Sequence, residues 1–189
     1  MADFPFIGRT QPPEALSGPH LWFVFENGRL VVVDDHEGMT LPYAPELESL
    51  GFKLQRQHYL GTFQGQHCFV AEVEQVPQGF RGNDLRRMLG QLDDTFFGIA
   101  SRAAQILEWD KTHQFCSRCG TATVLHANDR AKQCPSCGYV QYPRLSPCVI
   151  TIVVRGEYIL LGRQASWPAG VYSALAGFIE SGESIEETL

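Results

Sequence analysis

Two pairs of cysteines carry the clearest chemical signal in the sequence. Cys116 and Cys119 form one Cys-x-x-Cys pair, and Cys134 and Cys137 form a second pair after 14 intervening residues. In each pair, the turn after the first cysteine can bring the second thiolate back toward the same ion, and the glycine that follows permits the tight backbone. Four thiolates would complete a closed tetrahedral shell, so the spacing predicts a structural Zn²⁺ site with no open position for catalysis.

Other uses of these cysteines remain open at this level. A thioredoxin-like redox centre needs only one Cys-x-x-Cys pair in a βαβ setting, and disulfides are typical of secreted chains. The two remaining cysteines, Cys68 and Cys148, lie within apolar segments. We expect both to be small buried hydrophobic residues.

A glycine and a glutamate six positions apart form a second chemical motif. Gly177 and Glu183 stand where an apolar segment gives way to a helix signal. Ser184 and Glu187 fit a capping box, so a helix should begin near Ile185. A loop that closes on a helix N-terminus favours anions, because free backbone N–H groups point toward it. The motif is therefore typical of phosphate chemistry.

The N-terminal elements that would position these motifs are two hairpins. Asn27-Gly28 separates the apolar runs 21–26 and 29–33, and this dipeptide tolerates the positive φ angles of a type I′ turn. A second hairpin is expected around Gln64-Gly65-Gln66, between two further apolar runs. The first 75 residues therefore predict a small antiparallel β unit.

Helical patterns follow this β unit. Asn83 or Asp84 could cap a helix that runs through Arg86 and Leu89. A longer apolar face, with residues recurring at three- and four-residue spacing, comes next and predicts a helix packed on a core. Its members are Phe96, Phe97, Ala100, Ala103, Ala104 and Leu107.

After the cysteines, the pattern changes to strands. Residues 148–154 form an apolar, β-branched run, a turn leads into 158–161, and a third strand over 172–176 leads to Gly177. The expected fold is α+β in three parts. These are an N-terminal β-rich domain with a connecting helix (1–112), a zinc ribbon with two short strands (113–143), and the beginning of a second α/β domain (144–189).

Composition limits the classes of function. The chain has 44% hydrophobic and 19% charged residues, as expected for a globular protein, and a net charge of −6. The negative charge disfavours general binding to DNA or RNA, although a local pocket for a small phosphorylated ligand can still be basic. No apolar run approaches the length of a membrane helix, and the N-terminus lacks a secretory signal. We expect a soluble, cytoplasmic protein without a membrane partner.

The motifs together resemble one enzyme family. Leu175-Ala176-Gly177-Phe178 followed by Glu183 resembles the first third of the Nudix box, in which a glycine and a glutamate precede Arg-Glu and Glu-Glu pairs. The cysteine module just upstream, followed by Tyr142-Pro143-Arg144, is similar to the NADH pyrophosphatase branch of the Nudix hydrolases. The resemblance implies that residues 144–189 begin a Nudix α/β/α sandwich.

The resemblance also implies an activity. Members of this branch hydrolyse the diphosphate of NAD(H) to nicotinamide mononucleotide and AMP with Mg²⁺ or Mn²⁺, some remove the NAD cap from the 5′ end of RNA, and they are homodimers. The main metal-binding glutamates of the family would follow Leu189. We therefore expect the hydrolase activity to belong to a longer parent protein, and the chain as given to have negligible activity.

Site residues carry over by resemblance. Glu183 matches the first glutamate of the box, which is the expected catalytic-site residue and mainly supports the loop and the metal geometry. The backbone carbonyl of Ala176 matches a contact to the divalent cation. The matches to substrate-binding positions are Phe178 as a ring that stacks on nicotinamide, Tyr142 as a contact that can reach the partner subunit's site, and Arg86, Asp129 and Ile150. For each residue, an ordinary packing or solvated role remains open.

Two other functions remain open from the sequence. One is a zinc ribbon that binds nucleic acid, since the module contains four basic residues: Arg118, Arg130, Lys132 and Arg144. The net acidity of the chain disfavours this role. The other is a non-catalytic module that dimerises through the β unit and the ribbon.

Overall fold

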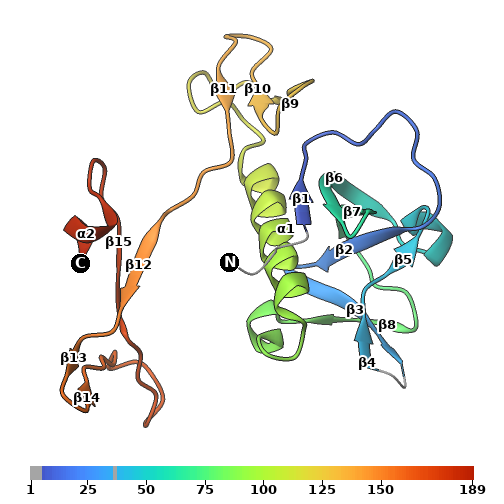
Figure 1. Ribbon diagram of the computed structural model, residues 1–189. Helices are drawn as coiled ribbons and strands as arrows, with labels where there is room; N and C mark the ends of the chain where they lie inside the picture. The colour runs from blue at the N-terminus through green and yellow to red at the C-terminus, as the bar shows by residue number, and fades with distance from the viewer. Residues whose placement is uncertain (1–5, 36–37) are drawn as a thin grey trace. The chain divides into compact units, whose positions relative to one another are not determined.

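The computed structural model describes residues 6–35 and 38–189, and the chain divides into two compact units, Met1–Pro143 and Arg144–Leu189 (Figure 1). No helix among the described residues has the length and hydrophobicity that a membrane crossing requires.

The first unit is built on one mixed sheet. Its strand order is β1-β6-β7-β2-β3-β4, with β5 beside β2 and β8 beside β3. The strands are β1 (Phe6–Gly8), β2 (His20–Glu26), β3 (Arg29–Asp35), β4 (Gly38–Thr40), β5 (Tyr43–Ala44), β6 (Leu54–Phe63), β7 (Gln66–Val73) and β8 (Phe80–Asn83).

Both predicted hairpins are confirmed. Asn27 and Gly28 join β2 to β3 with φ angles of 49° and 76°, and Gln64 and Gly65 join β6 to β7 with φ angles of 49° and 80°. Positive φ at both central residues is the signature of a type I′ turn, whose twist matches that of the strands. Local turn chemistry therefore determines these two pairings.

The sequence predicted a purely antiparallel β unit, but the observed sheet is mixed. β2 pairs with β7 in parallel, from Leu21 opposite Cys68 to Glu26 opposite Val73. This pairing joins the two hairpins through strands that are distant in the sequence. No short turn connects β2 to β7, so the local sequence does not indicate whether they run parallel or antiparallel. Every residue of β2 from His20 to Phe25 is buried, as expected for a strand covered on both faces. The α+β class itself is confirmed.

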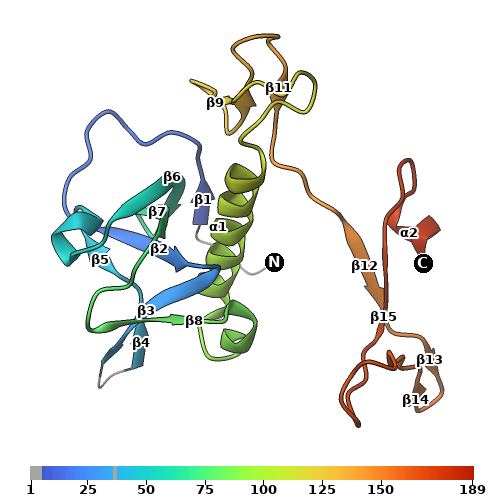
Figure 2. The ribbon, with the colours of Figure 1, turned by 180° about the vertical axis from the view of Figure 1, so that it is seen from behind.

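The two faces of the sheet form two cores. Phe23 and Val70 face the helix α1 (Asp94–Thr112), which lies along one side of the sheet in Figures 1 and 2. Val24 and Phe69 face the opposite core, next to the short 3₁₀ helix η1 (Leu47–Leu50). Successive residues of a strand point to opposite faces, which explains the alternation.

The expected helix after Asp84 is a single 3₁₀ turn, η2 (Leu85–Met88). Asp84 caps it as predicted, accepting a hydrogen bond from the backbone N–H of Arg86 at 2.9 Å. The turn does not continue as an α-helix, and Gly90 has a left-handed φ of 77° shortly after it. The predicted apolar helix is confirmed as α1, which Asp93 caps.

The cysteine module has three short antiparallel strands where two were expected: β9 (Val124–Leu125), β10 (Lys132–Gln133) and β11 (Val140–Gln141). Each strand has only two residues, too few to show a periodic pattern in the sequence.

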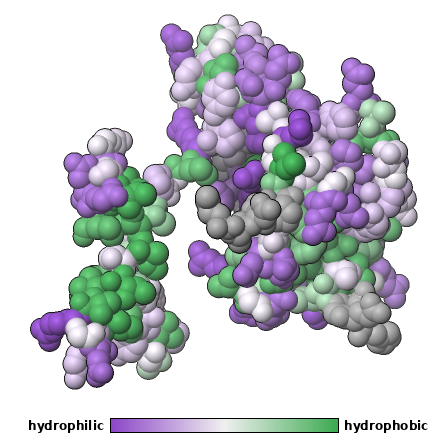
Figure 3. Space-filling view, in the orientation of Figure 1, coloured by the Kyte–Doolittle hydropathy of each residue, from purple (hydrophilic) through white to green (hydrophobic). Residues whose placement is uncertain are grey.

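The second unit contains β12 (Cys148–Thr151), β13 (Val154–Arg155), β14 (Tyr158–Ile159), β15 (Leu175–Phe178) and α2 (Ile185–Thr188). The run expected as one strand over 148–154 is divided between β12 and β13. Among the described residues, β12 pairs only with β15, and many large hydrophobic residues of this unit are exposed (Figure 3). Cys68 is buried as predicted, but the prediction for Cys148 is wrong, because no element of the unit covers its face of β12.

Candidate zinc and diphosphate sites

The four cysteines of the ribbon converge on one point. The sulfur atoms of Cys116, Cys119, Cys134 and Cys137 all lie within 4.8 Å of one another. Three of the Sγ–Sγ distances are 3.6, 3.4 and 3.6 Å. Four sulfurs bound at about 2.3 Å from one zinc ion would lie about 3.8 Å apart. The donor set and its spacing therefore fit a tetrahedral zinc ion with a structural role.

The two cysteine knuckles have the same backbone geometry. Gly120 N–H donates to the Cys116 carbonyl at 2.8 Å, and Gly138 N–H donates to the Cys134 carbonyl at 3.0 Å. Both glycines are left-handed, with φ of 75° and 72°. In the first knuckle, the backbone N–H of Arg118 also points at the Cys116 sulfur, at 3.4 Å. Such N–H donors favour the negatively charged thiolate that binds metal.

Two of the four cysteines, Cys119 and Cys137, have shifted pKa values. Hydrogen bonding with Thr121, whose hydroxyl lies 3.4 Å from the sulfur, lowers the pKa of Cys119 to about 6. Cys134 and Cys137 contribute further hydrogen bonds. The pKa of Cys137 shifts the other way: a backbone hydrogen bond at Tyr139 lowers it, but burial and hydrogen bonds with the other three cysteines outweigh this effect and raise it to about 11. The case for a metal site therefore rests on the geometry of the four sulfurs.

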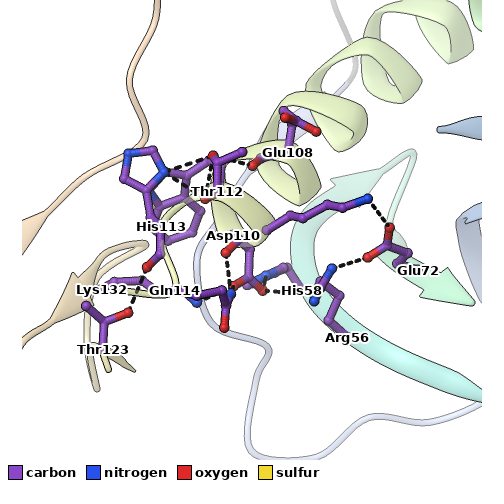
Figure 4. Close-up of polar contacts among 12 residues, drawn as sticks. Arg56, His58, Glu72, Glu108, Asp110, Thr112, His113, Gln114, Thr123 and Lys132 are labelled. Atoms are coloured by element: carbon purple, nitrogen blue, oxygen red, sulfur yellow. Dashed lines mark hydrogen bonds and ion pairs between the residues drawn. The ribbon is translucent and has the colours of Figure 1, made fainter. Parts of the chain in front are cut away.

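A buried ionic network attaches the ribbon to the helix and the sheet (Figure 4). Asp110 on α1 contacts Lys132 of the ribbon strand β10, and its carboxylate lies 2.8 Å from Nε2 of His58 on β6. The side chains of all three residues are at most 9% exposed. Burial raises the pKa of Asp110, but its hydrogen bonds with His58 and Lys132 outweigh this effect and hold the pKa well below its usual range. Asp110 is therefore a buried, paired carboxylate.

Further contacts attach the loop that precedes β10. Nη2 of Arg130 donates to the carbonyls of Arg9 and Tyr59, at 2.8 and 2.9 Å. Gln11 donates to the carbonyl of Ala127 at 3.0 Å. The ribbon is thus held by a charged pair and by backbone carbonyls from the β unit.

Two of the predicted substrate residues meet on the ribbon. The hydroxyl of Tyr142 donates to the Asp129 carboxylate at 3.2 Å, and this bond and the charge of Asp129 raise the pKa of Tyr142. Arg86 is exposed on η2, where its backbone N–H donates to the Asp84 carboxylate and its carbonyl accepts from the backbone N–H of Leu89 at 3.4 Å. Within the described residues, no hydrogen bond or ion pair joins Arg86 to Asp129 or Tyr142.

The second unit brings together three other predicted residues. Ile150 lies opposite Ala176 in the β12–β15 pair, and Phe178 lies opposite Cys148. Ala176 and Phe178 are two positions apart on β15 and therefore share a face. Ile150 lies opposite Ala176, so the side chains of Ile150 and Phe178 stand on the same face of the β12–β15 pair. Ile150 is 68% exposed and Phe178 is 69% exposed. Both are therefore available to a ligand or to further protein.

The loop between β15 and α2 is closed by its own side chains. The Glu183 carboxylate accepts from the backbone N–H of Glu180 at 3.0 Å and from the hydroxyl of Thr188 at 3.1 Å. Ser184 and Glu187 form the predicted capping box, and α2 begins at Ile185 as predicted. Glu183 thus ties the loop to the helix, as expected of a supporting residue; its role in catalysis stays a prediction.

Sequence reasoning missed the network that docks the ribbon. Asp110 could have been noticed, because it lies on the same helix face as the buried residues Ala103 and Leu107. A charged side chain at a buried position needs a partner. Lys132 left no such signal, since a lysine beside a cysteine knuckle is ordinarily solvated.

The comparisons with known proteins agree with this geometry. Residues 19–109 match the family model of the NADH pyrophosphatase-like rudimentary NUDIX domain, and residues 111–142 match that of the NADH pyrophosphatase zinc ribbon domain. The chain belongs to the NADH pyrophosphatase branch of the Nudix hydrolases. The first unit is thus related to a Nudix domain, which its hairpins alone did not indicate.

Curated relatives refine this assignment. The chain is 39% identical to the NAD-capped RNA hydrolase NudC of Stutzerimonas stutzeri over 92% of its own length and 64% of the relative. It is 37% identical to the protein of that name from Chromobacterium violaceum, over 97% of the chain and 66% of the relative. For the Pseudomonas aeruginosa protein, identity is 37% over 82% of the chain and 56% of the relative. The chain thus spans less than two thirds of these relatives.

Proposed function

We propose that this chain forms the ribbon and the diphosphate loop of an enzyme that hydrolyses the diphosphate of NAD(H), or of the NAD cap at the 5′ end of RNA, to nicotinamide mononucleotide and AMP. The proposal is supported by the names of the relatives. The observation that carries it is the loop closed by Glu183 ahead of the capped helix α2, because such a junction suits a diphosphate.

The residues have separate roles in this proposal. Mg²⁺ or Mn²⁺, when bound, would neutralise the charge that develops on the diphosphate. Glu183 holds the loop, and the carbonyl of Ala176 lies on β15 where it can contact the cation. Phe178 and Ile150 offer an apolar face to the nicotinamide ring. Tyr142, oriented by Asp129, contacts the substrate at the partner subunit's site, and Arg86 contacts substrate phosphate or ribose.

Two broader features belong to the same proposal. The enzyme is proposed to act as a homodimer, by its resemblance to the family, and Tyr142, 56% exposed on the ribbon, is free to contact a second copy. It acts in the cytoplasm, where reducing conditions preserve the six free cysteines. Sedimentation of the zinc-loaded chain tests the first feature directly: a dimer mass is expected, and a monomer at all concentrations contradicts it.

The loop can be tested in a chimera that appends the remaining C-terminal part of the Stutzerimonas stutzeri relative to this chain. The chimera is expected to release nicotinamide mononucleotide from NADH with Mg²⁺. Glu183→Gln should reduce kcat by about tenfold or more, because residues that hold the ligands of a metal site in place typically contribute about 10- to 100-fold.

Glu186→Gln is the matched control. Glu186 lies in the first turn of the same helix, and its side chain makes no hydrogen bond within the described residues, so its replacement should leave kcat nearly unchanged. Equal losses in the two variants would contradict the role of Glu183, and a chimera that folds and binds zinc but cleaves no NADH would contradict the proposed function.

A further inference from the structure

A histidine of the ribbon lies beside two of the residues proposed to contact the substrate. His126 directly follows the strand β9, and the loop that it begins carries Asp129 and leads into β10. The Asp129 carboxylate accepts the hydrogen bond of the Tyr142 hydroxyl at 3.2 Å. His126 is neither a member of the four-cysteine cluster nor one of the residues matched by resemblance.

Packing does not fix the side chains of Asp129 and Tyr142. The Asp129 side chain is 50% exposed, and Tyr142 is 56% exposed. An exposed side chain can sample several rotamers, so hydrogen bonds must select one arrangement for this pair. The bond between the two side chains fixes their relative orientation, but not the backbone that carries Asp129. The contacts that hold this backbone therefore decide where the Tyr142 hydroxyl points.

The imidazole of His126 holds the backbone at Asp129. Its Nδ1 accepts from the backbone N–H of Asp129 at 3.1 Å and from that of Asn128 at 3.4 Å. In an Asx turn, an aspartate or asparagine oxygen accepts from the backbone shortly after its own residue, and Nδ1 takes the place of that oxygen here. The Asp129 carboxylate lies farther from Nδ1, at 3.7 Å, so the ring acts on Asp129 through its backbone.

Backbone contacts anchor the rest of the loop. The backbone N–H of His126 donates to the carbonyl of Ala131 at 2.8 Å, and that of Ala131 donates to the carbonyl of Asp129 at 2.8 Å. Arg130, which follows Asp129 in the chain, donates to two carbonyls of the β unit. The loop is therefore a fixed frame, in which the His126 side chain supplies the acceptor for the Asp129 N–H.

We infer that His126 is a positioning residue of the substrate site, which orients Asp129 and, through Asp129, the hydroxyl of Tyr142. This role rests on the proposed function, in which Tyr142 contacts the substrate. It requires neither contact between His126 and the substrate nor proton transfer. Loss of the Nδ1 acceptor should thus weaken substrate binding and leave the hydrolysis step at the Glu183 loop unchanged.

Two substitutions separate the acceptor from the ring. His126→Phe keeps a flat ring and removes the acceptor. His126→Asn removes the ring and keeps an acceptor for the same N–H groups, as in an ordinary Asx turn. Metal analysis of both variants shows whether the ribbon keeps its zinc.

The first measurement is a titration of the Tyr142 phenol in the zinc-loaded chain, by NMR of isotope-labelled tyrosine. Tyr142→Phe identifies the signal. The hydrogen bond with Asp129, and then the charge of Asp129, raise the pKa of Tyr142. His126→Phe should lower this pKa toward the ordinary phenol value, and His126→Asn should leave it raised. An unchanged pKa in His126→Phe overturns the proposal.

The second measurement is NADH hydrolysis by the chimera with the Stutzerimonas stutzeri segment. His126→Phe should raise KM about threefold to tenfold and change kcat less than about twofold, since one neutral hydrogen bond contributes roughly this much to binding. His126→Asn should keep the KM of the unaltered chimera. Equal increases in KM for the two variants contradict the acceptor role, and a lower kcat at unchanged KM contradicts the positioning of a binding contact.

Failure of the positioning role is distinguishable from failure of the proposed function. If Tyr142→Phe leaves KM unchanged, the substrate role of Tyr142 fails, and the phenol titration decides whether His126 orients Asp129. If Tyr142→Phe raises KM and His126→Phe does not, only the positioning role fails. If His126→Phe loses zinc, His126→Ala replaces it, because it removes the acceptor without a new ring. Loss of zinc from both variants overturns the proposal, since His126 would then hold the fold of the whole ribbon.

Discussion

At the scale of single residues, the most consequential contact is the buried pair of Asp110 and Lys132. Each side chain is less than 10% exposed, and each belongs to a different part of the first unit. A buried charge is tolerated only when it is paired, so the two residues depend on each other. The pair acts as a specific attachment between the ribbon and α1, because an undirected apolar contact could not select one orientation.

Replacing Asp110 tests this attachment. Asp110→Asn keeps the shape of the side chain but leaves Lys132 buried without a counter-charge, which should reduce the free energy of unfolding by about 3 kcal/mol. Urea denaturation measures the change. The double variant Asp110→Asn/Lys132→Met removes both charges and should be more stable than Asp110→Asn alone. If it is not, the loss reflects packing and not the unpaired charge.

The same pair predicts an acid dependence. The folded-state pKa of Asp110 lies below its unfolded value, so its contribution to stability is complete above about pH 4 and is lost as the pH falls toward the folded pKa. The stability difference between the unaltered chain and Asp110→Asn should thus be constant near neutral pH and shrink below about pH 4. A stability difference between the two proteins that grows on acidification would contradict the lowered pKa of Asp110.

At the scale of elements, the ribbon depends on its metal. Its strands have two residues each, and few of its side chains are buried. Two of those buried side chains are the cysteines Cys116 and Cys134. A segment with so little apolar core gains its folding free energy from metal binding. We expect a chelator that removes zinc to raise amide hydrogen exchange across residues 116–142 and to leave β2 and β7 protected. Addition of zinc should reverse the change; protected ribbon amides in metal-free protein would contradict it.

A glycine in β6 fixes the position of the edge strand. Gly61 has a φ of 136°, and a Cβ at this position would lie 2.0 Å from the carbonyl oxygen of Ile7 in β1. Gly61→Ala should therefore displace β1 and reduce stability by more than about 2 kcal/mol. Gly65→Ala is the matched control, since Gly65 is also left-handed but faces open space, and should cost about 1 kcal/mol. Equal losses of stability in Gly61→Ala and Gly65→Ala, measured by thermal denaturation, would show that the space at Gly61 does not fix the position of β1.

At the scale of the whole molecule, the second unit lacks a covered core. Large hydrophobic residues of this unit are exposed, and its one helix has four residues. The Glu183 loop belongs to this unit, so its geometry rests on strands without a packed core. We therefore expect purified 1–189 to show no hydrolysis of NADH above background with Mg²⁺ or Mn²⁺, measured by release of nicotinamide mononucleotide. Turnover that persists through several purification steps would contradict this expectation.

The sequence by itself determined everything that depends on short-range chemistry: the type I′ turns, the helix α1, the capping box at Ser184, and the spacing of the four cysteines. Each of these is encoded within a few neighbouring residues, where backbone preference and ligand geometry act directly. Only the tertiary structure decided the parallel pairing of β2 with β7, the attachment of Lys132 to Asp110, and the hydrogen bonds of Arg130 to the carbonyls of Arg9 and Tyr59. These contacts join residues far apart in the chain, and their partners are selected by burial and charge pairing, which no local pattern records.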